Sequence, residues 1–311
     1  MKINELSDGQ KVEFEALIAN VTKGVSTNGA TYLNITLQDA TGTIDAKKWD
    51  ASEDDVKFYT IGKIIKVVGD VNLYRNSLLQ LKLSSAQKVD ESTIDYQDFV
   101  ISAPIKKDIL EKQLHEYMSE VKDSDVKALM EALINKFYTP FLTHPAATRN
   151  HHEYCSGLLH HSISVCKLAI TLADSYNDID KDILIAGALL HDLGKIIELT
   201  GPIIPSYTVE GRLIGHISLM QAEIREMAHE LNIKSEVPML LEHMILSHHG
   251  KREFGSPVLP MTREALLLSF ADDLDAKMNI LDKAYNLIEE GEFTNRIYPL
   301  EERCFYKPKK R

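Results

Sequence analysis

The sequence is poor in cysteine and in long apolar runs, and each shortage excludes a class of protein. Its three cysteines, Cys155, Cys166 and Cys304, cannot form a paired disulfide framework, so we expect free thiols in a reducing compartment. No apolar stretch reaches the length of a membrane span, and the first residues lack the apolar core of a signal peptide. We therefore expect a cytoplasmic protein with no membrane partner.

The chain also has fewer basic than acidic residues. The formal net charge is −11, and it is unevenly spread along the chain. Residues 1–90 hold 11 basic and 12 acidic side chains, whereas residues 91–311 hold 24 and 34. A broad basic groove is therefore excluded. If the substrate is a nucleic acid, local sites and metal ions must attract its phosphates.

The 311 residues are enough for two domains, and the pattern of the chain changes between its two halves. Five short strands with turn-like breaks are predicted at residues 12–21, 30–37, 43–49, 63–71 and 77–83. Such a series suits a small closed barrel, the OB-fold. From about residue 95 the apolar residues recur at helical spacing. We predict a multidomain chain: an all-β OB-fold barrel at 1–90, a helical bridging segment at 91–145, an all-α domain at 146–295 and a basic tail at 296–311.

Within the first half, residues 32–49 resemble the strand–turn–strand of nucleic-acid-binding OB domains, with the turn Asp39-Ala-Thr-Gly42. OB-folds hold single strands by stacking bases on aromatic side chains beside a few cations. The candidates for this role are Tyr32, Trp49, Phe58, Tyr59, Tyr74, Lys47, Lys48 and Arg75. Any one aromatic residue could instead belong to the barrel core, but as a group they favour a binding face.

In the second half, the pair His191-Asp192 closes the apolar helical run 182–190, and Gly194-Lys195 follow. Polar groups at the end of a buried helix cost free energy unless they are paired or bound to a metal. The dipeptide alone has little specificity. Further candidate ligands are His161, His216, the pair His248-His249, and Asp272 with its neighbours Asp273 and Asp275. Imidazole together with carboxylate suits Mn, Fe, Co, Ni or Zn.

In this order and helical context, these motifs resemble the HD superfamily of metal-dependent phosphohydrolases. The resemblance implies that Asp192 bridges two divalent ions. The implied ligands are His161, His191 and Asp272 at one ion, and His216 and His248 at the other. His249 could replace His248 or contact the substrate. Lys195 would hold a phosphate oxygen, with Arg252, His152 and Arg149 as weaker substrate contacts. His160 is expected to be a neighbour of the site, and Asp273 and Asp275 to lie on the helix surface or beside a ligand.

The whole chain resembles the YhaM family of bacterial exoribonucleases, which joins an OB domain to an HD domain. The resemblance implies a 3′-to-5′ exoribonuclease that converts single-stranded RNA, and also single-stranded DNA, to nucleoside 5′-monophosphates. The implied cofactors are two divalent ions, first of all Mn, with Co, Fe, Ni or Zn as alternatives. Two other functions stay open: a phosphatase or phosphodiesterase acting on small nucleotides, and a non-catalytic protein that binds single strands or replication-enhancer DNA. Assembly as a homo-oligomer also stays open.

Overall fold

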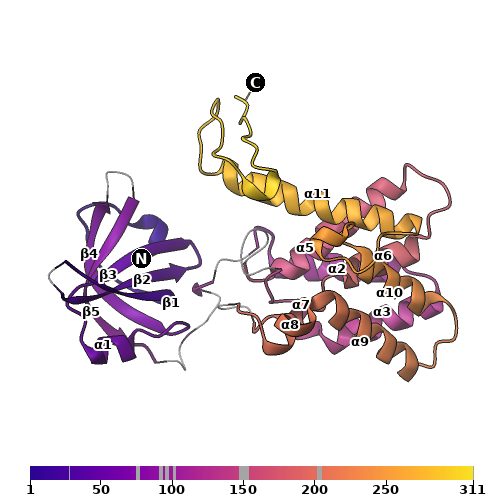
Figure 1. Cartoon of the computed structure of the whole chain (residues 1–311), viewed down its shortest axis with the longest axis horizontal. Coiled ribbons are helices and arrows are strands. Elements are labelled where there is room, and N and C mark those ends of the chain that lie inside the picture. Colours follow the sequence, from indigo (N-terminus) through magenta and orange to yellow (C-terminus); the bar gives the residue numbers. More distant parts are fainter. Residues whose placement is uncertain are drawn as a thin grey trace. The chain divides into compact units, whose positions relative to one another are not determined.

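The chain folds into two compact units, Met1–Ser102 and Ala103–Arg311, and each has its own hydrophobic core (Figure 1). The structure is a computed structural model, and it describes residues 1–27, 29–74, 78–90, 94, 98–100, 103–146, 154–201 and 205–310.

The first unit is a closed five-stranded barrel. Its elements are η1 (Ile3–Glu5), β1 (Lys11–Val25), β2 (Thr31–Asp39), β3 (Gly42–Lys48), α1 (Glu53–Phe58), β4 (Ile64–Tyr74) and β5 (Leu78–Lys88). The strand order is β1-β2-β3-β5-β4. The long strand β1 pairs with β4 through its first half and with β2 through its second, and a register shift lies between Ile18 and Asn20. The parallel pairing of β3 with β5 completes the predicted OB-fold.

Alternation of side chains builds the barrel core, as in Leu33, Ile35 and Leu37 of β2, which are all buried. One close approach requires glycine: a Cβ at Gly69 would lie 2.4 Å from the main-chain oxygen of Lys82, beside a register shift in the β4–β5 ladder. The barrel unit extends beyond the predicted boundary at residue 90. The Gln38 side chain donates to the Phe99 carbonyl (3.1 Å), and the Ala40 amide donates to the Asp98 carbonyl (3.0 Å).

The second unit is built from helices. They are α2 (Lys107–Glu120), α3 (Ser124–Lys136), α4 (Tyr138–Phe141), α5 (Gly157–Ala173), α6 (Lys181–Leu190), α7 (Lys195–Glu198), α8 (Val209–Ile214), α9 (His216–Glu230), α10 (Val237–Ser247), η4 (Arg252–Phe254), α11 (Arg263–Tyr285) and η5 (Tyr298–Leu300). Helices α2 and α3 contribute Leu110, Leu114 and Leu129 to the one helical core. The predicted bridging segment is therefore, in its helical part, a component of this unit.

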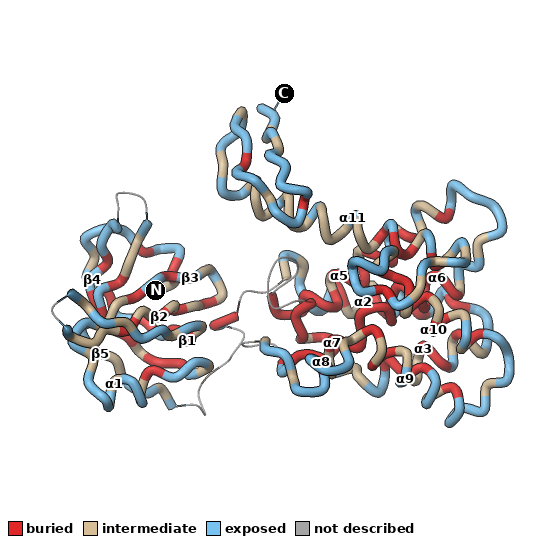
Figure 2. The backbone as a smooth tube through the Cα atoms, viewed as in Figure 1, coloured by how far each residue is buried: buried red, intermediate tan, exposed pale blue. Residues whose placement is uncertain are grey.

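Helix α6 lies at the centre of the unit and packs against α3, α5, α10 and α11. Every residue from Ile183 to Leu190 is buried, and Figure 2 shows this stretch surrounded by other buried segments. A helix that is apolar on all sides needs cover on all sides. As a result, His191 and Asp192, which follow its last turn, lie buried in the interior of the unit.

After α11 the chain forms a short arm with isolated bridges between Phe293 and Tyr306 and between Ile297 and Arg303. The Lys307 ammonium donates to the carbonyls of Tyr285 and Ile288 (2.8 Å each). The predicted basic tail is therefore anchored at Lys307 to the end of α11. No described helix has both the length and the apolar composition needed to cross a membrane.

The barrel core offers a direct test of its packing, because Trp49 is the only tryptophan of the chain and lies in this unit. Leu37→Ala should lower the free energy of unfolding of the barrel by about 2–5 kcal/mol, since it removes a fully buried side chain. Urea unfolding followed by Trp49 fluorescence measures this. Leu78→Ala, at a side chain 66% exposed, is the matched control and should change stability by less than about 0.5 kcal/mol. Equal effects at both positions would contradict the assigned core.

Candidate functional site

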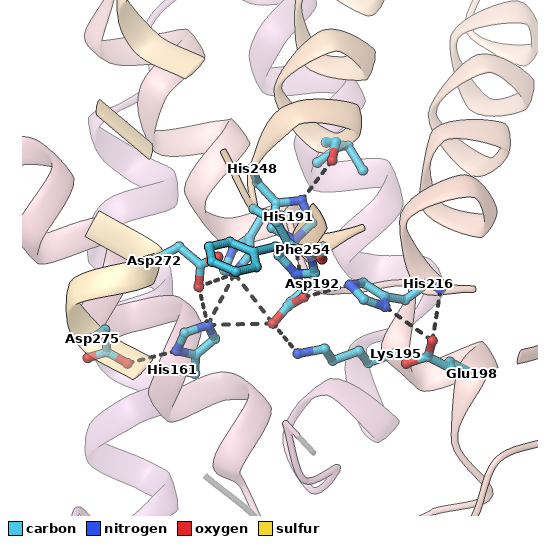
Figure 3. A network of polar contacts seen from close by, with 12 residues as sticks. His161, His191, Asp192, Lys195, Glu198, His216, His248, Phe254, Asp272 and Asp275 are labelled. Atoms are coloured by element: carbon cyan, nitrogen blue, oxygen red, sulfur yellow. Dashed lines mark hydrogen bonds and ion pairs between the residues drawn. The ribbon is translucent and has the colours of Figure 1, made fainter. Parts of the chain in front are cut away.

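The six predicted metal ligands converge inside the helical unit, although they come from five helices (Figure 3). His161 lies on α5, His191 and Asp192 follow α6, His216 begins α9, His248 follows α10, and Asp272 lies on α11. His161, His191, Asp192 and His248 are at most 1% exposed. Burial of this many polar groups is tolerated only where they are paired or bind an ion.

Asp192 stands at the centre of the cluster. Its Oδ2 atom lies 2.6 Å from the Lys195 ammonium and 3.4 Å from Nε2 of His191. Its Oδ1 atom faces the other way, 3.3 Å from Nε2 of His216 and 3.6 Å from Nε2 of His248. The carboxylate thus presents one oxygen to each side of the centre.

The first side is built around His161. Its Nε2 atom lies 3.1 Å from Oδ1 of Asp272, 3.2 Å from Nε2 of His191 and 3.5 Å from Oδ2 of Asp192. The Nδ1 atom of the same ring contacts Oδ2 of Asp275 (2.7 Å). Two imidazole nitrogens and two carboxylate oxygens therefore point at one another across a few ångströms.

The second side is formed by Asp192, His216, His248 and His249, each of which offers one ligand atom, all within 4.8 Å of one another. On the first side, ligand atoms of His161, His191 and Asp192 also lie within 4.8 Å of one another, so Asp192 belongs to both groups. The prediction left open whether His248 or His249 lies at the site. The structure brings both rings to it.

The potential ligand atoms are better suited to binding a cation than to forming hydrogen bonds with one another. Asp192 Oδ1, His216 Nε2 and His248 Nε2 are buried and form no hydrogen bond in the described structure. The Nδ1 atom of His191 faces a carbonyl, which can only accept, so this ring holds its proton there and turns a lone pair inward. Buried lone pairs that face a shared space are what a divalent ion such as Mn would satisfy.

The charge state differs among the histidines of the site. Burial would lower the pKa of His161, but the carboxylates of Asp272 and Asp275 outweigh it and raise that pKa to about 10, so at neutral pH this ring holds a proton that a bound cation would have to displace. Burial lowers the pKa of His248 and brings that of His249 to about 4, so both rings are neutral at neutral pH, the form in which an imidazole can bind a metal. Burial would raise the pKa of Asp192, yet Lys195 and His191 hold it well below its usual range.

Lys195 is itself buried and begins α7 immediately beside Asp192. Burial would lower its pKa, but the Asp192 carboxylate raises it, so the ammonium stays charged. The preceding residue, Gly194, allows a close approach: a Cβ there would lie 2.3 Å from the main-chain oxygen of His216. The absence of a side chain lets the start of α9 pack on this glycine, and this places His216 opposite Asp192.

One residue of the site was missed by the sequence prediction. Glu198, the last residue of α7, accepts a hydrogen bond from the His216 amide (3.1 Å) and lies 3.2 Å from its Nδ1 atom. A lone acid within the apolar string Ile196-Ile-Glu-Leu199 was the signal that could have revealed it. Asp275 was predicted to lie either on the helix surface or beside a ligand. It contacts His161, so the second placement is the one that the structure has. His160 bonds to Tyr154 (2.7 Å) and lies in neither metal-competent group.

The barrel carries a second candidate site on its surface. Tyr32 and Trp49 lie with ring centroids 5.2 Å apart, and Trp49 and Tyr74 are each 42% exposed. The Lys47 ammonium lies 5.4, 5.0 and 5.8 Å from the ring centroids of Tyr32, Trp49 and Tyr74. A surface pocket of about 160 Å³ adjoins them, lined by Lys47, Trp49, Asn72, Leu73, Tyr74, Gln80 and Lys82. We call Tyr32, Lys47, Trp49 and Tyr74 the aromatic face.

Other predicted contacts had different outcomes. Tyr59 is only 4% exposed and belongs to the barrel core, so its prediction as a binding residue was wrong. Phe58 packs against that core as a partly buried residue. Arg252 is exposed in η4, and its neighbour Phe254 accepts a hydrogen bond from His249 (2.7 Å). Three predicted contacts lie outside the described residues: Arg75, Arg149 and His152.

Comparisons with known proteins agree with the two domains. Residues 158–277 match the HD domain family, and residues 12–89 match the OB-fold nucleic acid binding domain family. The second OB-fold domain of replication protein A from Methanococcus maripaludis, 21% identical, covers 30% of this chain and 98% of its own with a TM-score of 0.24. That structural likeness is too low to add to the assignment.

Two curated relatives match almost the full length of the chain. The 3′-5′ exoribonuclease YhaM of Bacillus subtilis (strain 168) is 46% identical over 301 residues, which cover 96% of each chain. The protein of the same name from Geobacillus sp. (strain WCH70) is 45% identical over 301 residues, which cover 96% of this chain and 93% of that one. The chain therefore belongs to the YhaM family of 3′-5′ exoribonucleases.

Proposed function

We propose that the protein is a metal-dependent 3′-to-5′ exoribonuclease that hydrolyses single-stranded RNA to nucleoside 5′-monophosphates. The observation that carries the proposal is the buried Asp192 carboxylate, which two groups of metal-competent side chains share. The exoribonuclease relatives support the reaction, and the OB barrel supports a single-stranded polymer as the substrate. Stacking on aromatic side chains does not depend on the 2′-hydroxyl, so single-stranded DNA is included as a second substrate.

The proposed cofactors are two divalent ions, with Mn preferred because the donor set mixes imidazole and carboxylate. His161, His191 and Asp272 would hold one ion, and His216, His248 and His249 the other, with Asp192 facing both. When bound, such ions make a water molecule acidic enough to act as the nucleophile at neutral pH and neutralise charge on the phosphate. Burial of the histidines excludes bulk water, which strengthens every charge interaction at the centre.

Lys195 is proposed to hold the scissile phosphate. Its ammonium has three N–H donors, and the contact at 2.6 Å to Asp192 uses one of them. The pairing fixes the charge beside the carboxylate that faces both metal-competent groups. A non-bridging phosphate oxygen can accept one of the remaining N–H groups, and the bond strengthens as negative charge grows on that oxygen during hydrolysis.

The aromatic face is proposed to hold the strand. Its rings offer stacking surfaces that every base can use, and Lys47 adds a positive charge among them. A grip of this kind is independent of base sequence, as an exonuclease that degrades RNA of any sequence requires. It also does not need a basic protein, which agrees with a net charge of −11.

The exonuclease assignment predicts a specific product pattern. A 5′-labelled single-stranded RNA incubated with the protein and Mn should give a ladder that shortens from the 3′ end, with nucleoside 5′-monophosphates released, and a chelator should stop it. Asp192→Ala should reduce turnover at least about a thousandfold, because it removes the group shared by both metal sites. Cleavage of mononucleotides alone would favour a small-nucleotide phosphatase, and RNA binding without cleavage would favour a binding protein.

The role of Lys195 predicts a loss of turnover without a loss of metal. Lys195→Met should lower kcat about 100- to 1,000-fold because it removes a donor to the phosphate, while Mn binding persists. Lys277→Met is the matched control, since Lys277 makes the same 2.6 Å contact to an aspartate, Asp273, at the surface of α11. Single-turnover cleavage and Mn titration separate the two effects. Normal turnover in Lys195→Met would remove this residue from the chemistry.

The aromatic face predicts a loss of strand binding. Trp49→Ala should weaken the affinity for single-stranded RNA about 5- to 150-fold, the equivalent of about 1–3 kcal/mol for one stacked base. Fluorescence anisotropy in the presence of a chelator measures binding without cleavage. Phe270→Ala, at an exposed aromatic residue of α11, should bind as the unmodified protein does. Equal affinities for both variants would place the strand elsewhere.

A further inference from the structure

All five histidines of the centre have their outer ring nitrogen, Nδ1, at hydrogen-bond distance from an acceptor. Three of these acceptors are main-chain carbonyls: Ala188 for His191 (2.8 Å), Ile245 for His248 (2.7 Å) and Phe254 for His249 (2.7 Å). The other two are carboxylates: Asp275 for His161 (2.7 Å) and Glu198 for His216 (3.2 Å). One carboxylate-backed histidine therefore stands on each side of Asp192.

Glu198 is placed so that it controls both the ring and the backbone of His216. Its Oε1 atom accepts from the His216 amide at the first turn of α9 and also faces Nδ1 of the ring. The side chain is buried, and a Cβ at Gly211 would lie 2.3 Å from the Glu198 carbonyl, so α8 packs directly on this residue. With Nδ1 of the His216 ring facing this carboxylate, Nε2 is directed at Asp192 (3.3 Å to Oδ1).

Asp275 acts on His161 from one turn beyond Asp272 on α11. Residues three apart on a helix share a face, so both carboxylates reach the same imidazole. Asp272 Oδ1 lies 3.1 Å from Nε2, and Asp275 Oδ2 lies 2.7 Å from Nδ1. The ring is thus clamped at both nitrogens, with Asp272 on the metal side and Asp275 behind it.

We propose that Glu198 and Asp275 are positioning residues, each of which sets the affinity of one of the two metal sites. The inference rests on the metal centre of the proposed function. A carboxylate behind an imidazole fixes its tautomer and makes it a more basic ligand than a carbonyl does. Together with Asp192 and Asp272, these residues give the centre four carboxylates. The Lys195 ammonium offsets one of these charges, and the negative charge that remains favours the binding of divalent cations.

The test is Mn binding by the full-length protein, measured by calorimetry and by the electron paramagnetic resonance signal of free Mn. The unmodified protein should bind two ions. Glu198→Gln and Asp275→Asn should each weaken one of the two ions about 10- to 100-fold and leave the other unchanged. The double variant should weaken both. Because the amides keep the volume and an acceptor oxygen, the helices should keep their circular dichroism spectrum.

Two sets of variants assign each effect to its site. In a double-mutant cycle, Glu198→Gln should add little to His216→Ala but its full effect to His161→Ala, since coupled residues are non-additive and separate ones are additive. Asp275→Asn should show the reverse. Glu210→Gln, at an exposed glutamate of α8, and Asp273→Asn, on the surface of α11, are the matched controls and should bind two ions normally.

The outcomes separate this inference from the proposed function. Two Mn ions with unchanged affinity in both amide variants would overturn the positioning roles while leaving the metal centre intact. Weakening of the same ion by both variants would overturn the assignment of one residue to each site. The assignment of one residue to each site requires two ions, so a protein that degrades RNA but binds a single Mn ion would also overturn it. No Mn binding by the unmodified protein would instead contradict the proposed function itself.

Discussion

The buried carboxylate of Asp192 is the constraint on which the helical unit depends. Taking an ionised carboxylate out of water costs several kcal/mol unless opposite charges and donors replace the water. Lys195 satisfies one oxygen, whereas the other faces two imidazole nitrogens without a hydrogen bond. The surrounding helices supply the groups that replace water. Apolar α6 places Asp192 in the interior, and four other helices bring histidine or aspartate side chains close to it.

Much of this arrangement could be predicted because its signals are local. In the barrel, alternating residues such as those of β2 and the turn Asp39–Gly42 predicted strands, and the OB-fold prediction is confirmed. In the helical unit, His191-Asp192 stands at the end of an apolar run, so its burial followed from the run itself. The six predicted ligands meet in the structure because each stands where a helix begins, ends or crosses the core.

What could not be predicted depends on packing between distant segments. Glu198 and His216 contact each other only because α7 and α9 pack together. The sequence around either residue does not indicate this contact. Tyr59 was a candidate for the binding face, with the barrel core as the alternative, and it lies in that core after α1 ends. His248 and His249 would diverge on a regular helix. They follow the last turn of α10, where Gly250 at φ +73° bends the chain, and both reach the centre.

The Nδ1 contacts hold the histidine rings in set orientations, which matters for any ion that the rings bind. An imidazole that rotates freely loses conformational freedom when it binds a metal, and this loss weakens binding. In this protein folding has already oriented all five rings, with an acceptor behind each one. A cation bound among the unpartnered Asp192, His216 and His248 atoms would satisfy their lone pairs. The conformational cost of orienting the rings is thereby met during folding and not during metal binding. The aligned rings and the buried carboxylate together form a preorganised site.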